Sequence, residues 1–264
     1  MGRIDPEGQS QDRMTKKDKM SIHYETHGQV AHIIIDRPAA HNAFDNAMVD
    51  QLRQAWQRFE DGPERAVVVS GGSSKHFTVG ADLKNMPSDV WQGVPGVAIT
   101  VTKPVIVAVH GFCVGVGMAL VQAADLCVAS EDAQLLYSEP RVGLAYGLVS
   151  GLAARIPHKL AMEVMLLGKP LLAERAERMG LVNCVVAPGE QVAVALQYAQ
   201  VIATAAPLVI RWLKEGVDRH VLPDSPTVKA LQTMARVRQM QESSDFIEGR
   251  AAFIERRTPV FQGK

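Results

Sequence analysis

The stretch TKPVIVAVHGFCVGVGMAL, residues 102–120, decides the fold of this 264-residue chain. Its first half, Pro104 to Val109, is an apolar run of mostly β-branched residues, which is typical of a buried strand. The run ends at His110-Gly111, and helix-forming residues begin at Met118. The stretch therefore predicts a buried strand, a tight glycine turn and the start of a helix.

The glycine turn is suited to holding negative charge. Gly115 and Gly117 let another backbone or a ligand come close, and the first turn of a helix carries N–H groups without partners in the helix. Gly80, followed by Ala81, forms a second junction of this kind. If the two junctions face each other, the N–H groups of Ala81 and Val116 can bind one carbonyl oxygen as it gains charge. Each donor of such an oxyanion hole contributes a rate factor of about a hundred or more.

Composition excludes several classes of function. Basic and acidic residues number 28 each and aromatic residues make up 5%, so the chain has neither the basic field nor the stacking platform of nucleic-acid-binding proteins. We expect no membrane association, because no apolar run reaches the length of a bilayer span. The cysteines, Cys113, Cys127 and Cys184, lack metal-ligand spacing, so we expect reduced thiols and a cytoplasmic location.

The order of expected elements predicts an α/β core followed by helices. Residues 1–19 are polar and aperiodic, and we expect a disordered extension or a cloning-derived segment; residues 20–198 form the core and 199–264 a C-terminal helical region of the same unit. The expected strands are 21–26, 30–35, 66–70, 104–109 and 125–130. The expected helices are one capped by Asp45, then 161–167, 172–179, 191–205, 208–217, 225–241 and 246–257.

Three histidines of the first hairpin, His23, His27 and His32, alternate with apolar residues. This pattern favours solvent-facing strand histidines over a metal site. We therefore expect no metal in this chain.

Dinucleotide binding is one alternative use of the glycine turn. Gly115 and Gly117 follow a strand and open a helix, and Glu139 is the right type of residue for a ribose partner. However, the third small residue of that fingerprint is replaced by Leu120, and an extra expected strand intervenes before Glu139. The match is partial.

A cysteine hydrolase is a second alternative, because residues 111–115, GFCVG, have the spacing of a nucleophile elbow with Cys113 as nucleophile. Such an enzyme needs a downstream base, and the downstream histidines, His158 and His220, both have helical surroundings. A small buried cysteine in a tight turn is the plainer interpretation.

Several segments from Met20 to the C-terminus carry a family resemblance when taken together. They are DRPAAHNAF (36–44), FTVGADLKNM (77–86), KPVIVAVHGFCVGVGMAL (103–120), AQLLYSEPRVGL (133–144), AMEVMLLGKPLLAERAERMGLVNCVV (161–186) and SDFIEGRAAFIERRTPVF (244–261). In this order they resemble the crotonase superfamily, the enoyl-CoA hydratase/isomerase family. The resemblance implies a spiral of repeated β-β-α units, a C-terminal helical region used in trimer formation, and commonly a hexamer of two trimers.

The resemblance also implies an acyl-CoA substrate, whose thioester carbonyl would be bound by the N–H groups of Ala81 and Val116. Asp82, Leu83 and Lys84 match the strip that lines the adenine and pantetheine of CoA. No separate cofactor is implied, since CoA is part of the substrate.

Three more residues match positions that contact the CoA nucleotide. They are Arg37, near the first motif, and Phe253 and Arg256, on the last helix; the last pair can come from a neighbouring subunit. The family's usual lysine after the arginine-proline pair is Ala39 here, which removes one phosphate contact.

Glu139 matches the glutamate that acts as acid or base in this family, and its physical case is separate from that match. A thioester bound in the oxyanion hole has an acidified Cα proton, which a carboxylate within hydrogen-bond reach can take and return. Partial burial raises the pKa of a glutamate, which suits reversible proton transfer near neutral pH.

The main departure from the family pattern is Ala119, where hydratases typically carry a second glutamate. With Glu139 as the single acid/base, a 1,3-proton shift that isomerises an enoyl-CoA needs the fewest groups. Hydration by Glu139, alone or with Tyr137 or Tyr146, stays open. The alternative from another class is an acyl-CoA-binding homologue without catalysis.

Overall fold

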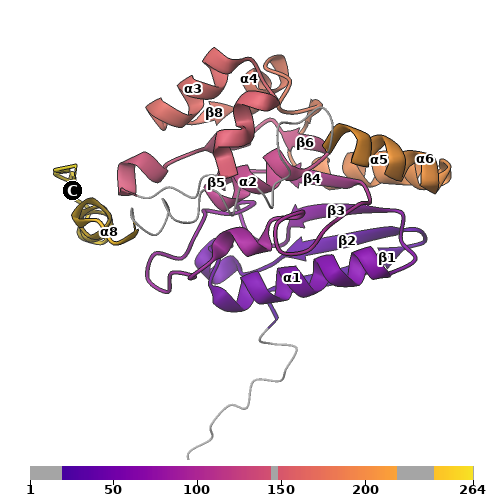
Figure 1. Ribbon diagram of the computed structural model, residues 1–264, viewed down its shortest axis with the longest axis horizontal. Coiled ribbons are helices and arrows are strands. Elements are labelled where there is room, and N and C mark those ends of the chain that lie inside the picture. Colours follow the sequence, from indigo (N-terminus) through magenta and orange to yellow (C-terminus); the bar gives the residue numbers. More distant parts are fainter. Residues whose placement is uncertain (1–19, 144–147, 219–240, 264) are drawn as a thin grey trace, which may run out of the picture.

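The computed structural model describes residues 20–143, 148–218 and 241–263 (Figure 1). The expected extension 1–19, Tyr146, and the expected helix 225–241 apart from its last residue lie outside the described residues. Two β-sheets and the helices packed on them confirm the expected α/β class.

The main sheet has six strands in the order β1-β2-β3-β4-β6-β9. Their bounds are β1 Ile22–His27, β2 Val30–Ile35, β3 Ala66–Gly71, β4 Val105–Val109, β6 Leu126–Ser130 and β9 Cys184–Val186. β1 and β2 form the expected antiparallel hairpin, and each later pair is parallel. The inner strands are continuous apolar runs because both of their faces are covered.

Helix α1 (Asn46–Asp61) covers one face of the main sheet (Figure 1). It begins where the sequence predicts, because the Asp45 side chain accepts a hydrogen bond of 3.0 Å from the amide of Met48. The buried side of the helix, centred on Trp56, belongs to the same apolar cluster as Val67 and other β3 and β4 residues. The helical spacing of its apolar residues therefore reflects core packing.

Helix α5 (Gln191–Thr204) covers the other face. Its buried residues Ala195, Ala199 and Ala203 are small, so the helix backbone packs close to strand residues such as Val68. The boundary that we expect at 198/199 falls inside this helix, which packs on the core sheet.

The prediction that all three histidines of the hairpin face solvent is wrong for His32. His32 is 7% exposed, because β2 has neighbours on both sides and its Nε2 lies 2.8 Å from Ser70 Oγ on β3. His27, on the edge strand β1, is exposed as expected.

A second sheet explains another difference from expectation. It contains β5 (Phe112–Val114), β7 (Gln134–Leu136) and β8 (Leu171–Leu172). Where the sequence predicts only a turn after β4, β5 intervenes, because residues 112–114 pair with β7. Helix α2 (Val116–Ala123) then begins two residues earlier than predicted.

The remaining helices agree with the predictions to within a few residues. They are α3 (His158–Leu167), α4 (Ala173–Arg178), α6 (Pro207–Gly216) and α8 (Ser244–Glu255), with 3-10 turns η1 (Pro38–Ala40), η2 (Val90–Gly93), η3 (Glu139–Val142) and η4 (Leu148–Ala154). Helix α8 lies at the opposite end of the molecule from α5 and α6 (Figure 1). Of the described helices, none alone has the length and apolar character of a membrane span; α5 and α6 reach them only as a pair, bent by 109°.

Candidate active site

The two glycine junctions lie against each other, which is the condition that an oxyanion hole from Ala81 and Val116 requires. The segment 77–82 runs beside β5, with the Thr78 amide bonded to the Phe112 carbonyl at 3.1 Å and the Val114 amide bonded to the Thr78 carbonyl at 3.0 Å. Gly80 and Gly115 both have positive φ, +95° and +56°. A Cβ atom on Gly115 would lie 3.7 Å from the Cα of Gly80, an ordinary contact distance, so the two junctions touch, and their positive φ values favour glycine at both positions.

The Ala81 amide makes no hydrogen bond to Phe44, the residue with which Ala81 pairs. Phe44 pairs with the segment through the Gly80 carbonyl and the Asp82 amide, each at 2.8 Å, which leaves the N–H of Ala81 on the side away from Phe44. Val116 is the first residue of α2, where a helix has no internal acceptor. Neither amide donates a hydrogen bond to another residue of the described part of the chain.

Glu139 lies at the start of η3, after β7, and its carboxyl lies next to the Gly115 junction. Its Oε1 is 3.0 Å from the position that a Cβ on Gly115 would occupy. The Gly115 amide is bonded to the Leu136 carbonyl at 3.1 Å, which holds β7 and the glutamate next to the start of α2. The structure therefore brings Glu139 together with both glycine junctions.

The carboxyl of Glu139 is buried and has a perturbed pKa. The residue is 5% exposed, and its Oε2 has no partner among the described residues. Burial raises its pKa to about 8, although hydrogen bonds from its own amide and that of Ser138 favour the charged form. No charged side chain contributes to the shift within the described segments. An isolated buried carboxyl of this kind is a common mark of an active site.

Ala119 lies one turn into α2 and is 5% exposed. Its amide is bonded to the Gly115 carbonyl at 3.2 Å, so it belongs to the same helix turn as Val116. A methyl group occupies the place of a second acid. Tyr137 is 8% exposed, and burial followed by the charge of Glu139 raises the pKa of its hydroxyl.

Arg37 and Asp82, both predicted CoA contacts, are paired with each other. Arg37 Nη1 lies 3.0 Å from Asp82 Oδ2, and its Nη2 lies 3.3 Å from Asp45 Oδ2. Burial raises the pKa of Asp82, but hydrogen bonds from Arg37 and from the amides of Asn85 and Lys84 outweigh it and the net pKa falls. Both side chains therefore hold the loop that contains Asp82 in place. The Lys84 side chain of this loop is exposed.

Asn42, to which sequence reasoning gave no role, holds this region together. It is fully buried, and its Nδ2 donates to the carbonyls of Ile35, His76 and Phe77 at 3.0, 3.1 and 3.1 Å. Its Oδ1 accepts from the Arg37 amide at 2.7 Å. The available signal was its place inside the motif DRPAAHNAF.

Phe253 and Arg256 lie on the exposed side and at the end of α8. Phe253 is 62% exposed and Arg256 is also exposed. Within the described chain, no hydrogen bond or ion pair joins either side chain to Arg37 or Asp82. Neither side chain is bonded to these two residues within the described chain, so a role of Phe253 and Arg256 in CoA binding stays a prediction.

A different residue of α8 makes that link. Arg250 Nη2 donates to the Leu83 carbonyl at 2.9 Å. Gly249 packs so closely on η3 that an added Cβ would meet the Val142 carbonyl oxygen. Helix α8 therefore contacts both the strip at Leu83 and the turn that carries Glu139.

Cys113 does not have the environment of a nucleophile. Its side chain is fully buried, and burial raises the pKa of its thiol well above the usual value. A reactive cysteine needs the opposite, namely access and a lowered pKa. The geometry contradicts the cysteine-hydrolase alternative.

Known proteins resemble this chain over most of its length. The sequence profile described as enoyl-CoA hydratase/isomerase matches residues 25–264. The (E)-benzylidenesuccinyl-CoA hydratase of Thauera aromatica is 33% identical over 257 residues, covering 92% of this chain and all of that protein. The carnitinyl-CoA dehydratase of Proteus mirabilis is 31% identical over 259 residues, covering 92% and 99%.

Solved structures give the same result. The crystal structure of carnitinyl-CoA hydratase from Mycobacterium avium superposes with a TM-score of 0.83 at 34% identity, over 92% of this chain and 99% of that one. The chain belongs to the enoyl-CoA hydratase/isomerase family and has the crotonase fold. It is accordingly an enzyme of that family, and its substrate is an acyl-CoA thioester.

Proposed function

We propose that Glu139 is the single acid/base of this enzyme and that it moves a proton at the carbon next to an enoyl-CoA thioester. The observation that carries the proposal is the position of its buried carboxyl, 3.0 Å from the place of a Cβ on Gly115 and next to the start of α2. A carboxyl with a pKa near 8 takes and returns protons efficiently near neutral pH.

The oxyanion hole is the second part of the proposal. The N–H groups of Ala81 and Val116 bind the thioester oxygen as the enolate forms. Their lack of partners in the described chain and the contact between Gly80 and Gly115 support this role. Preformed donors of this type stabilise developing charge without reorganisation.

Reversible hydration is the reaction that the relatives favour, since they are named hydratase and dehydratase. In dehydration, the Glu139 carboxylate takes the Cα proton and delivers it to the 3-hydroxyl, which leaves as water while the C2–C3 double bond forms. In hydration, the same carboxyl takes a proton from the attacking water and gives it to Cα. One carboxyl therefore suffices if both Cα and the oxygen of the 3-hydroxyl group or of the attacking water face it.

Isomerisation is a second candidate, supported by the methyl group of Ala119 where a second acid would hold water. Glu139 then removes a proton from one end of the three-carbon unit and returns it to the other. No water is added or lost.

For the CoA part of the substrate, we propose contacts with the strip Asp82, Leu83 and Lys84 and with Arg37. The ion pair of Arg37 with Asp82 fixes the loop, and the exposed ammonium of Lys84 is available to phosphate. Phe253 and Arg256 are exposed, which supports contact with the CoA of a neighbouring subunit.

We also propose a trimer or a hexamer of two trimers, and a cytoplasmic location. Helix α6 supports assembly, because Leu208 is 78% and Trp212 is 71% exposed in the isolated chain. Apolar side chains exposed to this degree on one helix usually pack against another chain.

The test is incubation of the purified protein with panels of 2-enoyl-, 3-enoyl- and 3-hydroxyacyl-CoA esters, with products identified by mass. Gain or loss of water indicates hydration chemistry, and an isobaric product with a shifted double bond indicates isomerisation. A protein that binds CoA esters and turns over none of them would be a binding homologue, and the proposal would be wrong.

A further inference from the structure

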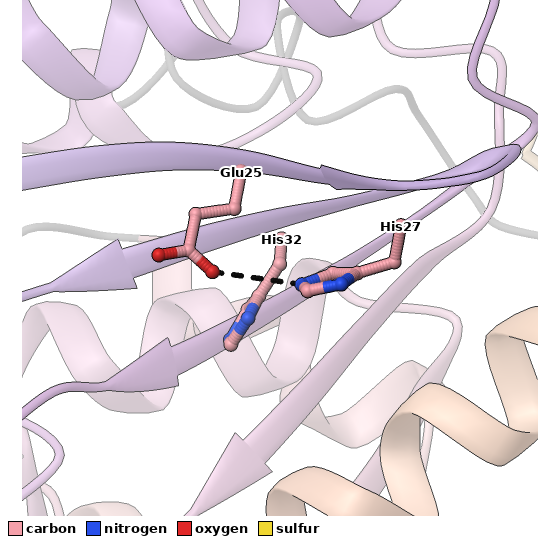
Figure 2. A group of neighbouring side chains, drawn as sticks. All are labelled: Glu25, His27 and His32. Carbon is pink, nitrogen blue, oxygen red and sulfur yellow. Dashed lines mark ion pairs between the residues drawn. The ribbon is translucent and has the colours of Figure 1, made fainter.

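Three side chains at the free edge of the main sheet point toward one another: Glu25, His27 and His32 (Figure 2). Glu25 lies directly opposite His32 in the β1–β2 register, and His27 is two residues further along β1, on the same face. Their ligand-type atoms all lie within 4.8 Å of one another. The hairpin itself therefore sets up the cluster.

The distances suit a small metal ion. Ligands around tetrahedral zinc, with bonds of about 2.0–2.1 Å, lie about 3.3 Å apart. The Glu25 carboxylate and His27 Nε2 are already 3.5 Å apart (Figure 2). Glu25 and His27 are both exposed and free to make the remaining small adjustment.

His32 is held in the way that a metal-binding histidine usually is. It is 7% exposed, and its Nε2 lies 2.8 Å from the buried Ser70 hydroxyl on β3. Because this contact occupies Nε2, Nδ1 is the ring nitrogen that is left to bind a metal ion. Metal-bound histidines typically use one nitrogen for the metal and anchor the other by such a hydrogen bond.

We propose that Glu25, His27 and His32 bind one divalent transition-metal ion of the zinc class at the edge of the sheet. Two imidazoles and one carboxylate are a ligand set that zinc accepts, with water as the fourth ligand. The ion joins the edge strand β1 to β2. The elements involved are separate from β5, α2 and η3, which carry the candidate active site.

The experiment is titration of the metal-stripped full-length protein with Zn²⁺ by calorimetry, and with Co²⁺ by its visible absorption. Wild type is expected to bind one ion per chain at this site, with the absorption of four-coordinate Co²⁺ and a rise in Tm. His27→Gln and Glu25→Gln change exposed side chains, so both variants should fold. Each is expected to weaken binding by about tenfold or more and to remove most of the Tm rise.

His23→Gln is the matched control, because His23 lies on the same face of β1, opposite Ile34 and outside the cluster. It should bind the ion as wild type does. Ser70→Ala should keep binding but weaken it by about tenfold, since only the anchor of His32 is lost. Binding that is absent in wild type, or unchanged in both His27→Gln and Glu25→Gln, would overturn the proposal and leave only the ion pair between Glu25 and His27.

Discussion

Replacement of Glu139 by glutamine tests the burial of this carboxyl and its chemical role together. Glutamine keeps the size and removes the titrating group. In the folded wild type the pKa is about 8, against 4.5 for the free side chain, so the folded state binds the proton more tightly than the unfolded state. The resulting stabilisation is complete below about pH 4.5 and is lost as the pH rises through about 8.

The magnitude follows from the shift. One pKa unit corresponds to about 1.4 kcal/mol, so a shift from 4.5 to about 8 corresponds to roughly 5 kcal/mol as an upper limit. Water entry and relaxation reduce this figure, because buried sites behave as if their dielectric constant were about 20. We expect wild type to lose a few kcal/mol relative to Glu139→Gln between about pH 5 and about pH 9.

The assay is urea unfolding of both proteins across this pH range, at one protein concentration because assembly also adds stability. Glu139→Asp is the control: it keeps a titrating carboxyl near the same place, so its stability should still fall with pH. Both variants should lose turnover, by a factor of about a hundred to ten thousand, while CoA-ester binding stays within a few-fold. Parallel stability curves for wild type and Glu139→Gln would refute the reasoning.

Four further changes test other parts of the structure. Gly115→Ala places a methyl group 3.0 Å from Glu139 Oε1 at a φ of +56°, so kcat should fall at least about tenfold with little change in KM; an unchanged kcat would contradict the site geometry. Arg37→Met removes the partner of Asp82, and it should raise KM for CoA esters and lower the unfolding free energy by about 1–3 kcal/mol; equal KM values would exclude Arg37 from substrate binding. Cys113→Ala should cost about 1 kcal/mol in denaturant unfolding and leave turnover intact, and loss of turnover would restore the hydrolase alternative. Trp212→Glu should shift the protein to smaller species in sedimentation, whereas an unchanged distribution would place the subunit contact elsewhere.

The sequence alone determined the fold class, five of the six strands of the main sheet (all but β9) and most helices. Buried parallel strands are apolar throughout, as in Val105–Val109, and amphipathic helices such as α1 repeat their apolar residues at a fixed spacing. Each of these signals lies within one short segment, so it can be recognised from a single sequence. The two glycine junctions and the family motifs also identified Ala81, Val116 and Glu139 as the residues to examine.

The tertiary structure alone decided which of these residues meet. Residues 112–114 form a strand because β7 and the segment 77–82 supply hydrogen-bond partners, and no local pattern encodes partners that are distant in the chain. The same reason accounts for the buried His32, which depends on β3, and for the pairing of Arg37 with Asp82. The raised pKa of Glu139 likewise depends on what surrounds it, because burial is a property of the packed molecule and not of the residue.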